Sequence, residues 1–297
     1  MSFLGITSEL PLTIWTRISS LAAAGSLEEA TVDVIQISNQ SSNETLPDLP
    51  HVLYGVVAFN CKDIIMICGG YDTNQTSHQG CFRYNATSHE WNEGPKMIKQ
   101  RTYAHAIQLN EDEFWITGGW RLTSSTEIYN SLDDKFVPGP DLPQAIYGHC
   151  MTQANSSHMI MAGGRVMPAG QAAYLFEKST NVWTKLKNMT SLRDQRPGCF
   201  TFERNGGLYL IVAGGNFAPD SEIYSFATET WTEGPALPHI FRWGASTLYQ
   251  DTFIMVMGAL SKYVIEYDRV NNSFFVWARE FENDRHYMDV VFLSSIN

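Results

Sequence analysis

The stretches FWITGG (residues 114–119) and LIVAGG (residues 210–215) follow one pattern, an apolar run that ends in paired glycines. Each is followed by a loop and then by a stretch in which polar and apolar residues alternate, TEIY at 126–129 and SEIY at 221–224. In both, a second aromatic residue stands seven positions after the tyrosine. Short apolar runs bounded by glycine, and short alternating stretches, are typical of β-strands.

This frame is repeated along the chain, with a decayed last copy. The second glycine, or the alanine in its place, stands at 70, 119, 164, 215 and 259, so the period is 44 to 51 residues. The aromatic pairs that follow are Tyr84/Trp91, Tyr129/Phe136, Phe176/Trp183, Tyr224/Trp231 and Tyr267/Phe274. A period of about 50 residues with four short strands per copy is the signature of the kelch repeat. The chain resembles the kelch family over nearly its whole length, and this resemblance implies a β-propeller.

The two ends of the chain predict one further blade that they share. We label the four strands of one repeat a to d in chain order. Residues 20–25 resemble a strand b with its glycine, residues 31–37 alternate like a strand c, and LPDLP at 46–50 matches the end of a strand d. Residues 285–293 have the form of the missing strand a. We therefore predict an all-β, six-bladed β-propeller of kelch repeats, whose last blade is closed by N-terminal strands b, c and d plus C-terminal strand a. Such closure removes free sheet edges; a five-bladed ring with frayed ends is the alternative.

The domain organisation follows from this blade count. Residues 1–15 are predicted to be a lead-in segment, and residues 16–297 a single propeller domain. The five uninterrupted blades are expected at 51–95, 101–140, 146–187, 197–238 and 243–280. We expect no second domain, in particular not the helical oligomerisation domain found in many kelch proteins that serve ubiquitin ligases.

Composition limits the classes of partner. Of 297 residues, 44% are hydrophobic and 17% charged, which suits a large buried core. Twenty basic against thirty-one acidic residues give a net charge of −11, which disfavours nucleic acid and anionic lipid as partners. The sequence has no apolar span of 18 residues, so we expect no membrane span. We expect a monomer.

Strand connectivity predicts where a partner would bind. Antiparallel strands place the loops between strands b and c, and those leading into strand a, on one face of a propeller. Six arginines are predicted to converge there: Arg101, Arg121, Arg165, Arg196, Arg242 and Arg285. Trp120, Tyr103, Tyr147 and Trp243 are expected beside them as apolar anchors. Guanidinium groups suit carboxylates or phosphates, and the expected partner is an acidic peptide or protein.

An alternative for these arginines is a structural role, since an arginine near the start of strand a recurs in several blades and can pair with an acidic group of a neighbouring blade. The kelch resemblance implies that this face, with its loops, binds partner peptides. The partner would be a ubiquitin-ligase client or the cytoskeleton in an intracellular setting, and matrix or a secreted protein in an extracellular one.

Catalysis is the competing function. His105 and His149 occupy equivalent positions in adjacent repeats, and with Cys199 they offer zinc ligands on paper. The residues are more simply framework, so we expect no metal, no cofactor and no catalytic residue. Kelch-like propellers include galactose oxidase, and bacterial kelch mutarotases are slightly similar. An enzyme of either type, using the central shaft, is therefore the alternative to a non-enzymatic binding module or scaffold.

The cues to localisation conflict. Residues 1–15 do not resemble a secretory signal, which favours the cytoplasm. Cys68 and Cys81 stand on adjacent predicted strands and are expected within disulfide range, a pattern similar to that of invertebrate kelch proteins, some of them extracellular. Cys61, Cys150 and Cys199 show no evident partners. Seven sequons for N-glycosylation also favour an extracellular setting: Asn39, Asn43, Asn74, Asn85, Asn155, Asn188 and Asn271.

Overall fold

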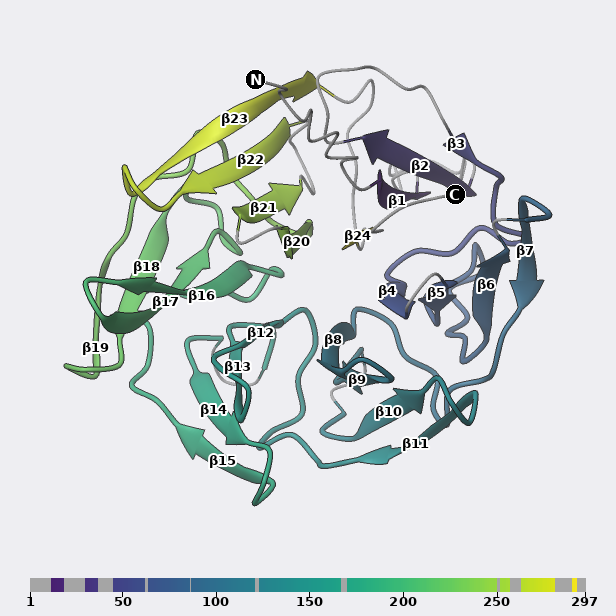
Figure 1. Cartoon of the computed structure of the whole chain (residues 1–297), viewed down its shortest axis with the longest axis horizontal. Helices are drawn as coiled ribbons and strands as arrows, with labels where there is room; N and C mark the ends of the chain where they lie inside the picture. Colours follow the sequence, from purple (N-terminus) through teal and green to yellow (C-terminus); the bar gives the residue numbers. More distant parts are fainter. Residues whose placement is uncertain are drawn as a thin grey trace, which may run out of the picture.

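The computed structural model describes residues 12–18, 30–36, 45–61, 64–85, 87–120, 123–166, 170–249, 252–256, 263–280 and 290–292. Within these residues the strands form six four-stranded antiparallel sheets, and no helix occurs. The sheets stand around a common axis like the blades of a propeller (Figure 1). No described segment is a helix with the length and hydropathy to cross a bilayer. The predicted all-β propeller is confirmed.

Five blades are each formed by consecutive strands. Blade 1 contains β4 (Val57–Cys61), β5 (Ile64–Cys68), β6 (Cys81–Asn85) and β7 (Glu90–Glu93). Blade 2 contains β8 (His105–Asn110), β9 (Glu113–Thr117), β10 (Thr126–Asn130) and β11 (Lys135–Gly139). Blade 3 contains β12 (Cys150–Gln153), β13 (His158–Ala162), β14 (Ala173–Glu177) and β15 (Val182–Lys185). Blade 4 contains β16 (Gly198–Arg204), β17 (Gly207–Ala213), β18 (Ser221–Ser225) and β19 (Thr230–Glu233). Blade 5 contains β20 (Ala245–Tyr249), β21 (Thr252–Val256), β22 (Tyr263–Asp268) and β23 (Ser273–Glu280).

Blade 6 joins the two ends of the chain. Its strands are β24 (Val290–Phe292), β1 (Leu12–Ile18), β2 (Ala30–Gln36) and β3 (Thr45–Leu46), in that order. The innermost strand β24 contacts both neighbouring inner strands, β20 and β4, so the ring is closed (Figure 1). The predicted sharing of one blade between the termini is therefore present.

One strand of blade 6 differs from the prediction. The strand beside β24 is Leu12–Ile18, with Ile14 opposite Val291, and not residues 20–25, which lie outside the described residues. The predicted lead-in 1–15 was therefore wrong from Leu12 onward. The physical reason is local preference: LTIWTRI alternates and contains β-branched and aromatic residues, whereas SLAAAG is rich in alanine, which is depleted in strands.

The seven-residue spacing between aromatics has a simple geometry. The two residues of each pair stand directly opposite each other on the third and fourth strands, as Tyr84 does to Trp91 and Tyr224 to Trp231. In three blades the tryptophan reaches back to the preceding blade and donates its indole N–H to a backbone carbonyl: Trp91 to Pro47 at 2.7 Å, Trp183 to Asp141 at 3.0 Å and Trp231 to Lys187 at 2.7 Å. These aromatic pairs therefore pack within one blade, and in three blades the tryptophan also bonds to the preceding blade.

The paired glycines lie where consecutive blades meet. The second glycine donates its N–H to a carbonyl in the segment leading to the next blade; Gly164 bonds to Arg193 at 2.8 Å and Gly215 to Phe241 at 2.7 Å. The first glycine has positive φ, and a Cβ on Gly214 would stand 2.5 Å from the carbonyl oxygen of Phe241. Any other residue would push the blades apart at this contact.

Candidate functional site

The loops that follow the glycine pairs and the segments that lead into the inner strands emerge on the same face, as predicted. Backbone hydrogen bonds join them: Tyr54 N–H to the Tyr71 carbonyl at 2.9 Å, Trp120 N–H to Thr102 at 2.7 Å, and Arg165 N–H to Tyr147 at 2.8 Å. We call this the mouth face. The opposite face carries the turns between the first and second and between the third and fourth strands.

An aromatic basin with a volume of ≈ 420 Å³ lies on the mouth face over the axis of the ring. Its described lining residues come from blades 1, 2, 3 and 5 and are Tyr54, Tyr71, Gln75, Tyr103, Trp120, Tyr147, Arg165 and Trp243. Six of these eight are aromatic. All four aromatic residues that the sequence predicted for the binding surface are among them.

The basin's aromatic rings form one continuous cluster. Trp120 and Tyr147 meet edge to face, with ring centroids 4.8 Å apart. Tyr103 precedes blade 2 and Trp243 precedes blade 5, and these blades stand on opposite sides of the ring (Figure 1). Their ring centroids nevertheless lie only 5.7 Å apart. The two side chains therefore meet across the central axis and form the floor of the basin.

Two glycines make room for this floor. A Cβ on Gly55 would stand 2.7 Å from Cε1 of Tyr103, and one on Gly148 would stand 3.3 Å from Cζ3 of Trp243. Tyr103 and Trp243 themselves have positive φ, 55° each, which is uncommon for bulky residues. Backbone strain of this kind often occurs at binding sites, where the surrounding structure holds a side chain in a required place.

Arg165 is the one charged residue among the eight described residues that line the basin. It is exposed, and its backbone pairs with that of Tyr147. In the part of the site that the structure describes, a hydrophobic floor and wall are thus combined with one guanidinium at the rim. This arrangement suits a ligand with an apolar body and a carboxylate or other anionic group.

Of the predicted arginines that the structure describes, only Arg165 lines the basin. Arg101 is 1% exposed, and its Nε donates to a Glu127 oxygen at 2.8 Å. Arg196 is 4% exposed, so neither of these two is accessible to a partner. The prediction that they bind one was wrong: Arg101 is paired with Glu127 at the joint of blades 1 and 2, and Arg196 is buried near His105 and His149, whose pKa values its charge lowers. Arg121 and Arg285 lie outside the described residues.

Arg242 remains on the mouth face but outside the basin. Its guanidinium stacks over the ring of Phe217, 4.2 Å from the centroid, and bonds to Gln195 at 3.1 Å. Phe217 is 66% exposed. The pair adds a second apolar and cationic spot on the face beside Trp243.

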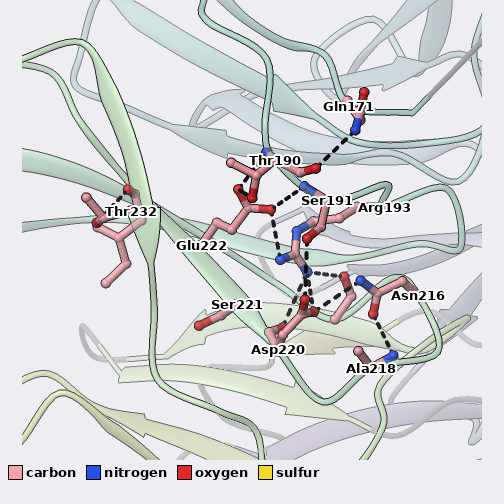
Figure 2. A network of polar contacts seen from close by, with 12 residues as sticks. Gln171, Thr190, Ser191, Arg193, Asn216, Ala218, Asp220, Ser221, Glu222 and Thr232 are labelled. Carbon is pink, nitrogen blue, oxygen red and sulfur yellow. Dashed lines mark hydrogen bonds and ion pairs between the residues drawn. The ribbon is translucent and has the colours of Figure 1, made fainter.

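Sequence reasoning missed Arg193, which repeats the role of Arg101 at the joint between blades 3 and 4. It is fully buried and donates to Glu222 at 3.1 Å, to Asp220 at 3.1 Å and to the Gly214 carbonyl at 2.8 Å (Figure 2). Glu222 also accepts the N–H groups of Thr190 and Ser191.

The missed signal was a covariation between repeats. Two positions of each repeat change together: one in the segment before the innermost strand, and one two residues before the first aromatic of the aromatic pair. Where the first is arginine the second is glutamate, as in Arg101 with Glu127 and Arg193 with Glu222. At the joints that lead into blades 1, 3 and 5, both positions are apolar or aromatic, and the pairs are Leu53/Phe82, Ile146/Tyr174 and Phe241/Ile265. These arginines therefore hold blades together.

The two histidines lie below the basin floor. Their ring centroids are 6.0 Å apart, and Nε2 of His149 lies 2.8 Å from the Thr117 hydroxyl. Burial lowers the pKa of His105 to about 3, with the charge of Arg196 as a second cause. Burial also holds the pKa of His149 well below its usual range, with smaller contributions from His105 and Arg196.

Disulfides account for four of the five cysteines. Cys68 and Cys81 are joined within blade 1, with Cα atoms 4.0 Å apart, as expected. Cys150 and Cys199 are also joined, which the sequence did not suggest; this disulfide links inner strands β12 and β16 of different blades. Cys199 therefore has no thiolate to offer a metal beside the histidines. In the described part of the chain, no three His, Cys, Asp or Glu residues are grouped to hold a metal ion.

Comparison with known proteins points to one family. A family described as "Kelch motif" matches residues 53–98. Human Kelch-like protein 23 is 25% identical over 196 residues, which cover 63% of this chain and 33% of that protein. Human Kelch-like protein 34 is 23% identical over 217 residues, covering 66% and 33%. The chain thus matches about a third of the length of these relatives.

A solved structure supports the same fold. The structure of YjhT superposes with a TM-score of 0.69 at 12% identity, covering 91% of this chain and 98% of that one. At this identity the likeness concerns the fold, and it extends over nearly the whole ring.

Proposed function

Because the chain is a kelch-repeat β-propeller, we propose that it is a non-enzymatic protein-binding module whose aromatic basin takes an acidic segment of a partner protein. The observation that carries this proposal is the convergence of six aromatic residues from four blades around Arg165. In this proposal Arg165 binds a carboxylate of the partner, and an apolar side chain next to that carboxylate enters the basin.

The composition of the mouth face supports a protein as the partner. Tryptophan, tyrosine and arginine are the residues that most often dominate the binding energy of protein interfaces. Trp120 is 42% exposed although it is large and apolar, and Phe217 lies exposed on the same face with Arg242 stacked on it. A partner that extends from the basin towards Phe217 would cover both exposed rings.

The local charge of Arg165, and not the net charge of the chain, supports an acidic segment. The chain carries a net charge of −11, so long-range electrostatics alone would repel an acidic ligand. Specific recognition of a carboxylate therefore requires a local cation, and Arg165 supplies one at the basin rim. A bidentate bond to a partly desolvated guanidinium contributes about 1.5–3 kcal/mol.

The experiment screens an array of synthetic peptides in which Asp or Glu is flanked by apolar residues, and then measures Kd for the best binder by calorimetry. We expect Arg165→Ala to weaken binding by about 10- to 100-fold, as the loss of a charged hydrogen bond predicts. Trp120→Ala should weaken it comparably through lost apolar contact.

Arg269→Ala is the matched control, because it removes the same charge from an exposed turn on the opposite face. It should leave Kd unchanged. An equal loss of peptide affinity in the Arg165 and Arg269 variants would show that only net charge matters. Unchanged affinity in the Arg165 and Trp120 variants would refute the basin as the binding site.

A further inference from the structure

The sequon asparagines divide between the two faces of the ring. Asn39 and Asn43 lie outside the described residues, and the other five are all exposed. Asn74 and Asn188 lie in loops of the mouth face. The remaining three lie in strand-connecting turns of the opposite face: Asn85, Asn155 and Asn271.

Asn85 and Asn155 have the same local geometry. The side-chain oxygen Oδ1 of Asn85 accepts the N–H groups of Thr87 at 2.9 Å and Ser88 at 3.3 Å. That of Asn155 accepts the N–H groups of Ser157 and His158, both at 2.9 Å. In both asparagines the side chain stabilises the turn through its oxygen, and Oδ1 of Asn155 also lies 3.1 Å from Nδ1 of His158.

An N-linked glycan leaves this geometry intact. The sugar is attached to the amide nitrogen Nδ2, and the oxygen keeps the hydrogen bonds that it accepts from the backbone N–H groups of the turn. Asn271 differs, because its Nδ2 donates to Asp268 at 2.5 Å. Glycosylation there would compete with that bond.

The disulfides are a second, independent observation. The pairs Cys68–Cys81 and Cys150–Cys199 both lie among buried residues. Disulfides form and persist in oxidising compartments, through which secreted and cell-surface proteins pass. Sequons in exposed turns of such proteins are acceptors for N-glycans.

We propose that Asn85 and Asn155 carry N-linked glycans on the face opposite the aromatic basin. In the transfer, Nδ2 loses a proton and bonds to C1 of the first sugar of a lipid-linked oligosaccharide. The bond between C1 and the diphosphate oxygen breaks, and the lipid diphosphate leaves with the electron pair. The glycans make the far face hydrophilic and leave the mouth face open to a partner.

The test uses the full-length protein recovered from cells that produce it naturally. Digestion with peptide N-glycosidase should increase its mobility on a gel and convert Asn85 and Asn155 to aspartate, as read by peptide mass spectrometry. Recovery of both peptides unmodified, or glycans confined to Asn74 and Asn188, would overturn the proposal.

Variants expressed in the same cells separate glycan loss from turn damage. Thr87→Ala removes the sequon but keeps Asn85 and its two turn hydrogen bonds, so it should lose one glycan, whereas Thr87→Ser should keep it. Asn130 provides a matched control, because its Oδ1 caps the equivalent turn of blade 2 but Leu132 stands where a sequon needs Ser or Thr. Asn130→Gln should leave the mobility unchanged; a shift equal to that of Thr87→Ala would contradict the assignment.

Discussion

Arg193 and Glu222 form a fully enclosed ion pair at the joint of blades 3 and 4, with Nη2 and Oε1 3.1 Å apart and side chains 0% and 4% exposed. Removing one partner of such a pair leaves the other charge buried. We expect Arg193→Ala to lower the free energy of unfolding by about 3–5 kcal/mol. Chemical denaturation followed by tryptophan fluorescence measures this.

A repeat of the same chain supplies the compensating change. Phe241 and Ile265 occupy the two equivalent positions between blades 4 and 5, and both are buried. The double variant Arg193→Phe/Glu222→Ile should therefore be more stable than Arg193→Ala, since apolar pairs often replace buried ion pairs without loss. Equal or lower stability would show that the N–H groups of Thr190 and Ser191 depend on Glu222 more than the charge pair does.

The glycine pairs provide a second prediction. Gly214→Ala places a methyl group against the Phe241 carbonyl and forces alanine to φ +64°, so it should destabilise the protein by about 2 kcal/mol or more. Gly80→Ala is the control, because nothing lies within 4 Å of a Cβ there. Thermal unfolding should separate the two variants; equal melting temperatures would mean that the blades can adjust.

The two disulfides should contribute different amounts to the free energy of unfolding. Cys150–Cys199 closes a loop with a sequence separation of 49, and Cys68–Cys81 one of 13. Chain entropy predicts a contribution of about 4 kcal/mol for the longer loop and about 3 kcal/mol for the shorter. Denaturation of the Cys150→Ala/Cys199→Ala and Cys68→Ala/Cys81→Ala variants tests the order. The reverse order would mean that the inner strands are held without the inter-blade link.

Stability should depend on pH through the two low-pKa histidines. The pKa of His105 is about 3 in the folded protein and about 6.5 in an unfolded chain, so the unfolded state binds more protons between these values. Stability is therefore lost as the pH falls from about 6.5 towards 3. His105→Gln should make the free energy of unfolding less steep over this range than in the wild type. If the free energy of unfolding of the variant and that of the wild type changed in parallel with pH, the pH dependence would come from carboxylates instead.

The fold could be predicted from the sequence because each repeat shows its own physical constraints. The glycine pair is required by a close backbone contact between blades, and the tyrosine and tryptophan face each other across two strands. These contacts are the same in several copies, so the pattern is visible without the structure. Leu12–Ile18 was missed because blade 6 keeps no glycine pair or aromatic pair by which to align it.

For the binding site, the aromatic residues could be predicted from the sequence but the exposure of the arginines could not. Loop connectivity placed Tyr103, Tyr147, Trp120 and Trp243 on one face, and they do meet there. Connectivity does not show how deep a side chain lies, so buried Arg101 could not be told from exposed Arg165 by position alone. The partner carboxylate was the missing signal: an arginine matched by a glutamate in its own repeat is a structural residue.

The shared blade also makes the beginning and end of the chain neighbours in space. Ile14 pairs with Val291, so the backbone could be reconnected there and opened at a turn of another blade without a change of sheet order. A mechanical load applied to the two ends would act first on the short β24–β1 ladder, leaving the uninterrupted blades to give way later. We therefore expect the ring to open first at the three-residue pairing of β24 with β1.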